Sequence, residues 1–345
     1  MNLSSDNYYK RIFSFAATVF IFAGCADQPE TEVNEKADHA HHSSAHQEDE
    51  AHQVSILKDD TNAVASTLEP LPFPQPFNTE QAPYQTMPAE AAAAGIRMPP
   101  GFHASSFASE PAVQQPISMT TDSRGRLWVV ENYTYGEGIF LNVGLDKLRD
   151  RILIFEDSDN DGRHDKRTVF WDGGQQLTSI VLGRGGVWVL ALPELLFIPD
   201  ANGDDVPDGE PEVILDGFVF EKGSHTVANG LRWGPDNWLY GRHGILPYSN
   251  VGKPSSPDQE RTPVNVGVWR YHPEREVFEI VARGTTNPWG MDWNEQGELF
   301  FINTVIGHLW HVIPGARYRR MMGLDSDPRI YGVIEQTADH VHWAV

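Results

Sequence analysis

A short turn flanked by aromatic residues recurs four times in this sequence. The stretch ANGLRWGPDNWLYG, residues 228–241, has tryptophans on both sides of a Gly-Pro-Asp-Asn turn, and such a turn between short apolar runs is typical of a β-hairpin. Comparable turns begin at Asp122, Leu182, Gly234 and Asn294, at intervals of 60, 52 and 60 residues. A repeat of this length that contains only strands indicates a β-propeller with one blade per repeat.

Each turn is followed by a strand with a large aromatic residue at one equivalent position, namely Trp128, Trp188, Tyr240 and Phe300. We expect these side chains to pack where one blade meets the next. A second strand pair follows each turn, so the blades are expected to be four-stranded and antiparallel. The earlier run GFHASSFA, residues 101–108, is expected to form a strand that could close the ring by pairing with the last blade.

The sequence therefore predicts an all-β protein, a β-propeller with about four blades. We expect it to be part of a larger, six-bladed ring, because an open propeller exposes sheet edges. The alternative is a four-bladed propeller that closes by itself. The propeller is expected to occupy residues 101–345 and to be incomplete at its C-terminal end, since a fifth inner strand is due where the sequence stops.

Composition agrees with a turn-rich β protein and argues against one class of partner. The 345 residues include 30 Gly and 24 Pro, and 40% are hydrophobic, which allows a large core. The formal net charge is −22. Because nucleic-acid affinity depends largely on Lys and Arg that neutralise phosphates, we expect no nucleic-acid partner.

The first 25 residues resemble an export signal. Lys10 and Arg11 precede an apolar run at residues 12–24, which suits a signal peptide and is shorter than the roughly 20 residues of a spanning helix. The run ends in FAGC, similar to a bacterial lipobox, and Cys25 is the sole cysteine. We expect lipidation at Cys25, and so an exported protein anchored to the bacterial membrane in the periplasm or at the cell surface. The alternative is a cysteine buried in the signal segment.

Residues 26–100 are predicted to be a disordered tether. They are rich in acidic residues, His and Pro, and they show little periodic apolar pattern.

Two acidic loops lie between predicted outer strands, DSDNDGRHD at residues 157–165 and DANGDDVPD at residues 200–208. Alternate oxygen-bearing side chains in a tight loop can direct several hard oxygens at one cation, which is the chemistry of Ca²⁺. We predict structural calcium sites formed by Asp157, Asp159, Asp161 and Asp165, and by Asp200, Asn202, Asp204 and Asp208. The alternative is a pair of solvated turns, because the same residues are common turn formers.

Several phrases carry a family resemblance that covers about residues 101–345. They are RLWVVEN, FEDSDNDGRHDK, NGLRWGPDNWLYGRHG, NPWGMDWNEQGELFF, GHLWHVIPGARYRRMMG and ADHVHW. The segment resembles the N-terminal propeller of the exported "membrane-bound dehydrogenase" proteins of planctomycetes. More distantly, it resembles the soluble glucose and aldose dehydrogenases that depend on pyrroloquinoline quinone (PQQ).

The resemblance implies a dehydrogenase that oxidises a sugar or an alcohol at the central face of the propeller. It also implies PQQ as the cofactor and a cytochrome-type acceptor for the electrons. The exported family members usually carry a cytochrome c domain with a CxxCH motif. This sequence lacks that motif, so we expect no haem on this chain.

The resemblance also implies site residues. The base that takes the hydroxyl proton in the sugar dehydrogenases corresponds here to His225. Asn287 matches an asparagine that helps to hold the quinone, but Thr286 stands where those enzymes have an arginine. We expect Arg242 or Arg283 to supply the missing guanidinium.

Alternatives remain at each level. Trp289 could stack on a planar ring or a sugar, or could simply pack, and His225 could be an ordinary loop histidine. For the whole protein, the alternative is a non-catalytic surface lipoprotein whose propeller binds carbohydrate or protein. A calcium-dependent hydrolase would need several carboxylates at the channel, where only Glu131 is well placed.

Overall fold

The computed structural model describes residues 87–135 and 149–338, except residues 222, 224, 326 and 328. All of these belong to one of two units in the chain, Val54–Val345. The predictions for the signal segment, Cys25 and most of the tether fall outside the described residues. Strands dominate, and the helical segments are short: α2 (Ala89–Gly95), α3 (Tyr133–Tyr135) and the 3₁₀ turn η3 (Asp258–Glu260).

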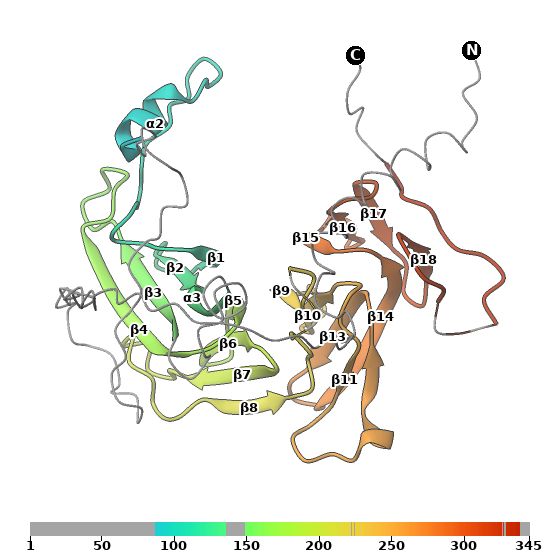
Figure 1. Ribbon diagram of the computed structural model, residues 1–345. Helices are drawn as coiled ribbons and strands as arrows, with labels where there is room; N and C mark the ends of the chain where they lie inside the picture. The colour runs from blue at the N-terminus through green and yellow to red at the C-terminus, as the bar shows by residue number, and fades with distance from the viewer. Residues whose placement is uncertain are drawn as a thin grey trace, which may run out of the picture. The chain divides into compact units, whose positions relative to one another are not determined.

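Four sheets follow one another along the chain and correspond to the four predicted repeats (Figure 1). Blade 1 contains β1 (Pro116–Thr121), β2 (Leu127–Glu131), β3 (Asp150–Glu156) and β4 (Lys166–Gly174). Blade 2 contains β5 (Leu177–Leu182), β6 (Gly186–Ala191), β7 (Glu194–Pro199) and β8 (Glu212–Leu215). Blade 3 contains β9 (Asn229–Trp233), β10 (Leu239–His243), β13 (Gly267–His272) and β14 (Val277–Thr285). Blade 4 contains β15 (Pro288–Trp293), β16 (Leu299–Asn303) and β17 (Leu309–Val312).

The first strand of each blade packs against the first strand of the next. The strand β5 contacts both β1 and β9, and β9 in turn contacts β15. Within each blade the strands pair antiparallel in chain order. Sheets that follow one another through their innermost strands form a propeller arrangement, so the predicted all-β fold with four blades is confirmed.

Three of the four repeated aromatic residues lie at junctions between blades, as predicted. Trp128 belongs to the core between blades 1 and 2, and Trp188 to the core between blades 2 and 3. Tyr240 belongs to the core that blades 3 and 4 share. Phe300, the equivalent residue of blade 4, stacks on His311 of its own sheet, with ring centroids 4.8 Å apart. The predicted position is thus confirmed in blades 1 to 3 and not in blade 4.

The strand expected at residues 101–108 does not form. This segment contains no regular structure and packs on the face of blade 1, where Phe107 joins a cluster with Val129 and Leu153. The backbone N–H of His164 donates to the carbonyl oxygen of Phe107 at 3.2 Å. The prediction was wrong because this backbone bonds to the β3–β4 loop of blade 1 rather than to a strand of the last blade.

Helical structure is also present before residue 101, inside the predicted tether. The helix α2 contains the alanine run, and alanine has the highest helix propensity. The carboxylate of Glu90 pairs with the guanidinium of Arg163 in the first acidic loop, with one contact of 2.9 Å. The predicted tether thus contains one short helix near its C-terminal end.

The strand β18 (Arg317–Arg320) follows blade 4 in the chain but completes the sheet of blade 3. It pairs in parallel with β14, with Arg317 opposite Arg283 and Arg320 opposite Thr285. Blade 4 therefore has three strands in its sheet within the described residues, instead of the four expected. A two-stranded sheet of β11 (Ser249–Val251) and β12 (Thr262–Val264) lies in the connection between β10 and β13.

The two ends of the blades differ. At the turn end, tight turns join the first two strands of each blade, and both acidic loops lie there because they join β3 to β4 and β7 to β8. At the opposite end, which we call the crossover end, the chain passes from one blade to the next. The crossovers are residues 174–177, 215–229 and 285–288. The connection between β10 and β13 also lies at the crossover end.

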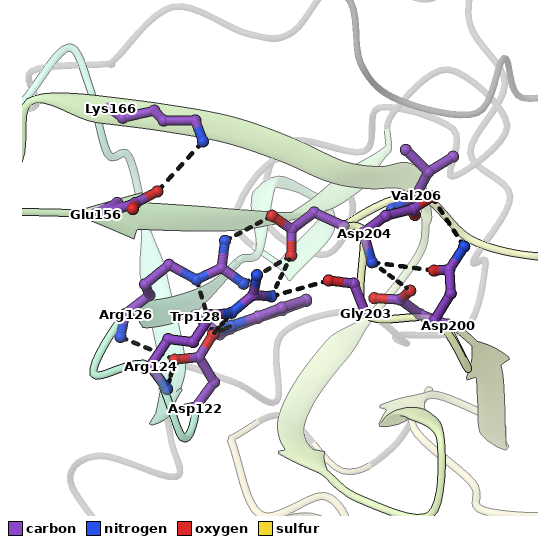
Figure 2. A network of polar contacts seen from close by, with 12 residues as sticks. Asp122, Arg124, Arg126, Trp128, Glu156, Lys166, Asp200, Gly203, Asp204 and Val206 are labelled. Atoms are coloured by element: carbon purple, nitrogen blue, oxygen red, sulfur yellow. Dashed lines mark hydrogen bonds and ion pairs between the residues drawn. The ribbon is translucent and has the colours of Figure 1, made fainter. Parts of the chain in front are cut away.

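A network of ion pairs joins blades 1 and 2 at the turn end (Figure 2). The Arg126 side chain is 5% exposed, and its Nη1 and Nη2 lie 2.5 and 2.6 Å from the two carboxylate oxygens of Asp205. Its Nε also donates to Asp122 at 2.8 Å, and Nη2 of Arg124 donates to Asp205 at 3.0 Å. Asp122 accepts a further hydrogen bond from Nε1 of Trp128 at 3.1 Å. The first turn of blade 1 is thereby attached to the acidic loop of blade 2.

Candidate functional site at the crossover end of blades 3 and 4

Several strands of blades 3 and 4 begin or end at the same place. The strand β9 begins beside the end of β10, with Asn229 opposite Arg242. The strand β14 ends at Thr285, and β15 begins three residues later and packs against β9 and β10. Polar side chains at these strand ends therefore gather at one junction.

Two predicted site residues meet at this junction, although 62 positions separate them in sequence. Nδ2 of Asn287 donates to the backbone carbonyl of His225 at 3.4 Å. The backbone of Asn287 is held in turn by Asn303, whose Oδ1 accepts from its N–H at 2.8 Å. The side chain of Asn287 is buried, and His225 is exposed. The structure thus joins the buried Asn287 amide to the backbone of the exposed residue His225.

Arg242 lies in the same region and is 7% exposed. Its guanidinium crosses the backbone of Gly230, where a Cβ atom would lie 1.3 Å from Nη2 of Arg242. Within the described part of the chain, Nε and Nη1 of Arg242 have no hydrogen-bond partner. Burial, together with the charge of Arg232, lowers the pKa of Arg242 to about 9, so the group stays cationic at neutral pH. A buried cation without a counter-charge is costly, which favours an anionic ligand here.

Neutral polar groups at the junction are also unpaired. Buried polar atoms nearly always have a hydrogen-bond partner, so an unpaired group calls for an explanation. Within the described chain, such atoms are Asn229 Oδ1, Thr285 Oγ1, Thr286 Oγ1, Asn287 Oδ1 and Asn303 Nδ2. Thr285 also has a φ of 78°, which is strained for a β-branched residue. Unpaired polar groups and local backbone strain thus coincide at the crossover end of blades 3 and 4.

The other two predicted cofactor residues lie differently. Arg283 is on β14, separated from β10 by β13, and its Nη1 donates to the carbonyl oxygen of Pro263 at 3.1 Å. Burial and the nearby charge of Arg317 lower the pKa of Arg283. The structure thus brings Arg242, and not Arg283, to the junction. Trp289 begins blade 4 next to the junction and is 39% exposed.

Two further titratable residues near this end, His243 and Glu131, are buried and bonded to other residues of the protein. His243 is fully buried, and its ring nitrogens lie 2.9 Å from the Gly244 carbonyl oxygen and 2.8 Å from the Ser249 hydroxyl. Burial lowers the pKa of His243 to about 4, so the ring is neutral and serves packing. Glu131 is fully buried and ion-paired with Arg151, so its carboxylate is not exposed as the hydrolase alternative requires.

The acidic loops lie at the turn end, away from this junction. In the first loop, one oxygen each of Asp157, Asp159 and Asp165 lie within 4.8 Å of one another. Asp161 instead accepts a hydrogen bond from the backbone N–H of Arg163 at 2.8 Å. This is the one group of three or more acidic, His or Cys side chains with such spacing in the part of the chain that the structure describes.

The second acidic loop repeats the backbone pattern of the first. The N–H of Asp204 donates to Asp200 at 3.2 Å and to Asn202 at 3.0 Å, and Asp208 accepts from the N–H of Ala201 at 2.6 Å. Calcium binding at both loops stays a prediction. Their position at the turn end agrees with a structural role.

Sequence reasoning did not single out Asn229 or Thr285. One signal in the sequence could have indicated the junction, namely Gly230 within a predicted strand. A glycine inside a strand often marks a place where another group approaches the backbone closely. Its φ of 68° and the contact with Arg242 explain that glycine. Within the described residues, no helix has both the length and the apolar character to cross a membrane.

Comparison with solved structures finds related folds at low sequence identity. An oxidoreductase described as a glucose dehydrogenase, from Thermus thermophilus, matches with 18% identity and a TM-score of 0.46, over 66% of this chain and 70% of the other. The PQQ-bound aldose sugar dehydrogenase of Streptomyces coelicolor matches with 16% identity and a TM-score of 0.44, over 66% of this chain and 68% of the other. Among curated proteins, none matches the chain.

A family comparison covers most of the sequence. The match runs from residue 88, just before α2, to residue 342, and so includes all four blades. Because this span is well over half of the chain, the protein belongs to the family described as a domain of unknown function, DUF7133.

Proposed function

We propose that this protein is a quinoprotein-like dehydrogenase that oxidises a sugar or an alcohol at the crossover end of blades 3 and 4. In this proposal PQQ is the cofactor, and the electrons pass to a cytochrome-type acceptor. One observation carries the proposal: Nε and Nη1 of the buried Arg242 have no hydrogen-bond partner among the described residues, and Arg242 lies at the same strand ends as Asn287, whose amide bonds to the backbone of the exposed His225.

The donor set at the junction fits a quinone that bears carboxylates. When bound, PQQ would supply the oxidising power, because its quinone accepts a hydride from the carbon that is oxidised. Arg242 would bind a carboxylate through its unpaired Nε and Nη1. Asn303, with an unpaired Nδ2, can donate to a further oxygen of the ligand. In this proposal the guanidinium that holds the cofactor belongs to Arg242 on β10. Thr286, which stands where the sugar dehydrogenases have an arginine, offers only a hydroxyl.

His225 is the residue that we assign to proton transfer. A ring nitrogen of His225 would take the proton from the substrate hydroxyl as the carbon–hydrogen bond breaks. The hydrogen bond from Asn287 to the backbone of His225 fixes the position of this residue relative to the junction, while its side chain stays accessible to substrate.

The test uses the full-length protein with calcium and PQQ, and reduction of an artificial acceptor is followed across a panel of sugars and alcohols. We expect reduction with at least one sugar and retention of the quinone after desalting. Arg242→Gln should abolish retention, whereas Arg283→Gln, the same substitution on β14, should leave it unchanged. No reduction, together with no retained quinone, would reject the dehydrogenase.

The second candidate function is a non-catalytic propeller that binds carbohydrate or protein through the same end. It is favoured by Thr286, which lacks the charge of an arginine, and by the 39% exposure of Trp289. Binding of a sugar without any turnover under the conditions above would support this candidate.

For the cellular location, we propose export and lipidation at Cys25, which would anchor the protein to the bacterial membrane. Residues 1–86 lie outside the described part of the chain, so this proposal is supported by the sequence pattern alone. Labelling with a fatty-acid analogue in a bacterial host should mark the wild-type protein and not Cys25→Ala. Labelling of both would reject lipidation at this residue.

A further inference from the structure

An open cavity of about 360 Å³ lies at the outer edge of blade 3, where β18 joins β14. Its lining includes Thr262 of β12, residues 278–283 of β14 and Arg317, the first residue of β18. The strand β13 separates β14 from β10, and Arg242 does not line this cavity. The volume falls within the roughly 300–1,000 Å³ that is typical of ligand pockets.

The cavity borders β14 because β18 covers only the last part of that strand. The two strands pair at Arg283 and Thr285. Just before this ladder, the N–H of Gly315 donates to the carbonyl oxygen of Val281 at 2.7 Å. In the described part of the chain, no strand continues this pairing towards Val277. The earlier half of β14 therefore borders an open space and not a neighbouring strand.

Part of the cavity surface is apolar. Phe278 and Ile280 lie on the face of β14 that packs against the core between blades 2 and 3, and both are only partly buried. Val281 and Ala282 belong instead to the core between blades 3 and 4. Phe278 and Ile280 thus give the cavity an apolar surface that neighbouring side chains do not fully cover.

Two arginines stand side by side at the other end of the cavity. Arg283 and Arg317 are paired residues of the parallel ladder, in which neighbouring strands lie about 4.8 Å apart. Like charges opposite each other in a sheet are destabilising. Nη1 of Arg283 donates to the carbonyl oxygen of Pro263 at 3.1 Å, and no carboxylate of the described residues forms an ion pair with Arg283.

Arg317 has acidic partners in the segment that follows β18. Its Nη1 donates to Asp325 at 2.6 Å, and its Nη2 lies 3.9 Å from Asp327. Asp327 also pairs with Arg329, at 3.0 Å from Nε. The charge of Arg317 is therefore balanced by its own partners, and the charge of Arg283 is not.

The other carboxylates near Arg283 do not compensate for this. Glu279 lines the cavity, but it accepts a hydrogen bond from Nε of Arg270 at 2.7 Å. Burial and the charge of Arg317 lower the pKa of Arg283, and the opposing effect of Asp325 does not outweigh them. A cation without a carboxylate partner, next to an apolar surface, favours an anionic ligand with an apolar body.

We propose that this cavity binds a carboxylate with an apolar body, with the carboxylate on Arg283 and the apolar part against Phe278 and Ile280. Arginine suits this role because its planar guanidinium can donate two parallel hydrogen bonds to one carboxylate. Arg317 adds a second positive charge beside the first. The inference does not depend on the dehydrogenase, because Arg242 and Asn287 do not line the cavity.

The test titrates octanoate into the full-length protein without PQQ and records the heat of binding. We expect saturable binding of octanoate. Octanamide has the same chain without the charge, and acetate has the charge without the chain, so each should bind roughly tenfold more weakly or worse. This ligand series uses the wild-type protein and therefore does not depend on the folding of any variant.

Variants locate the bound octanoate. Arg283→Gln should weaken binding by roughly tenfold or more, because it removes a charge-assisted contact. Arg283→Lys keeps the charge without the planar fork and should give a smaller loss. Arg232→Gln is the matched control, since it removes an exposed arginine on β9 of the same blade and should leave binding unchanged. The melting temperature is checked for every variant, and Arg283→Gln should keep that of the wild type.

The outcomes are distinct. Equal binding of octanoate, octanamide and acetate, or no binding of octanoate, would overturn the site. Octanoate binding that is unchanged in Arg283→Gln would place the ligand elsewhere and would also overturn it. Loss of octanoate binding in Arg283→Gln but not in Arg232→Gln, at an unchanged melting temperature, would support the cavity as a carboxylate site whether or not the protein oxidises sugars.

Discussion

A Cβ atom on Gly230 would lie 1.3 Å from Nη2 of Arg242, so the glycine is what allows this guanidinium to reach the junction. Gly230→Ala should displace Arg242 and abolish quinone retention. An alanine at a positive φ costs about 1–2 kcal/mol of stability by itself. Gly230→Ala should lower the free energy of unfolding by more than this amount, because the added Cβ also clashes with Arg242. Gly297→Ala is the matched control, because Gly297 has a φ of 79° and no heavy atom within 4 Å of an added Cβ. If Gly230→Ala and Gly297→Ala lose the same stability in chemical denaturation and both retain the quinone, Gly230 is not what allows Arg242 to reach the junction.

Removal of Arg126 should loosen the contact between blades 1 and 2. Arg126→Gln leaves the carboxylates of Asp205 and Asp122 without their main partner, and their side chains are only 13% and 10% exposed. We expect a loss of about 1–3 kcal/mol in the free energy of unfolding. The control Arg232→Gln breaks an exposed pair with Asp292, which should cost less than about 1 kcal/mol. Comparable losses in the two variants would show that the network is not a structural link.

The same network should weaken in acid. Burial alone would raise the pKa of Asp205, but the hydrogen bond and charge of Arg126 outweigh it, so the pKa is lowered in the folded protein. A carboxyl group with a lowered folded pKa stabilises the fold above its unfolded pKa, and this contribution is lost as the pH falls through the folded value. In Asp205→Asn, the unfolding free energy should therefore decrease less than in wild type as the pH is lowered from about 5 towards 2.

Asp150 should have the opposite pH dependence. It is fully buried and accepts hydrogen bonds from the N–H groups of Thr134 at 2.8 Å and Leu177 at 2.9 Å, yet burial raises its pKa to about 6. Because the folded state then binds the proton more tightly, its contribution to stability is greatest below about pH 4 and decreases as the pH rises from 4 to 6. The expected decrease is about 3 kcal/mol.

The comparison of wild type with Asp150→Asn isolates this group. The asparagine variant should be less stable throughout, because its amide cannot accept every hydrogen bond that the carboxylate accepts. The difference in unfolding free energy between the two proteins should shrink between about pH 4 and 6, as the wild type loses stability. A constant difference over this range would mean that Asp150 does not titrate there.

Calcium should stabilise the first acidic loop. Three carboxylates, from Asp157, Asp159 and Asp165, have oxygens within 4.8 Å of one another and repel unless a cation lies between them. Addition of Ca²⁺ at about 100 times its dissociation constant should raise the unfolding free energy by about 2.7 kcal/mol. Asp159→Asn should reduce the shift in melting temperature, whereas Glu260→Gln, an exposed acid in η3, should not. An unchanged melting temperature in calcium and in a chelator would favour solvated turns.

The blades could be predicted because their signal is local and repeated. A turn, an aromatic residue and an apolar strand recur within each blade, so the positions of Trp128, Trp188 and Tyr240 follow from spacing alone. The strand expected at residues 101–108 shows the limit of such patterns. Its apolar residues do pack, but against the face of blade 1, and a short sequence does not specify which partner its backbone will bond.

The candidate site was only partly predictable, for a related reason. His225 and Asn287 could be named from the family resemblance, whereas the choice between Arg242 and Arg283 depends on which strand each occupies within blade 3. The parallel pairing of β18 with β14 joins residues more than 30 positions apart and fixes the surroundings of Arg283. Neither periodicity nor composition carries information about such a pairing.

The strand β18 has a mechanical consequence for the site. Since it leaves blade 4 and completes the sheet of blade 3, the two blades are joined on their outer side as well as through their inner strands. Neither blade can tilt without breaking that parallel ladder, so the wall that both contribute around Arg242 should be stiff. Binding of a ligand at the junction would then proceed without a hinge motion of blade 4 against blade 3.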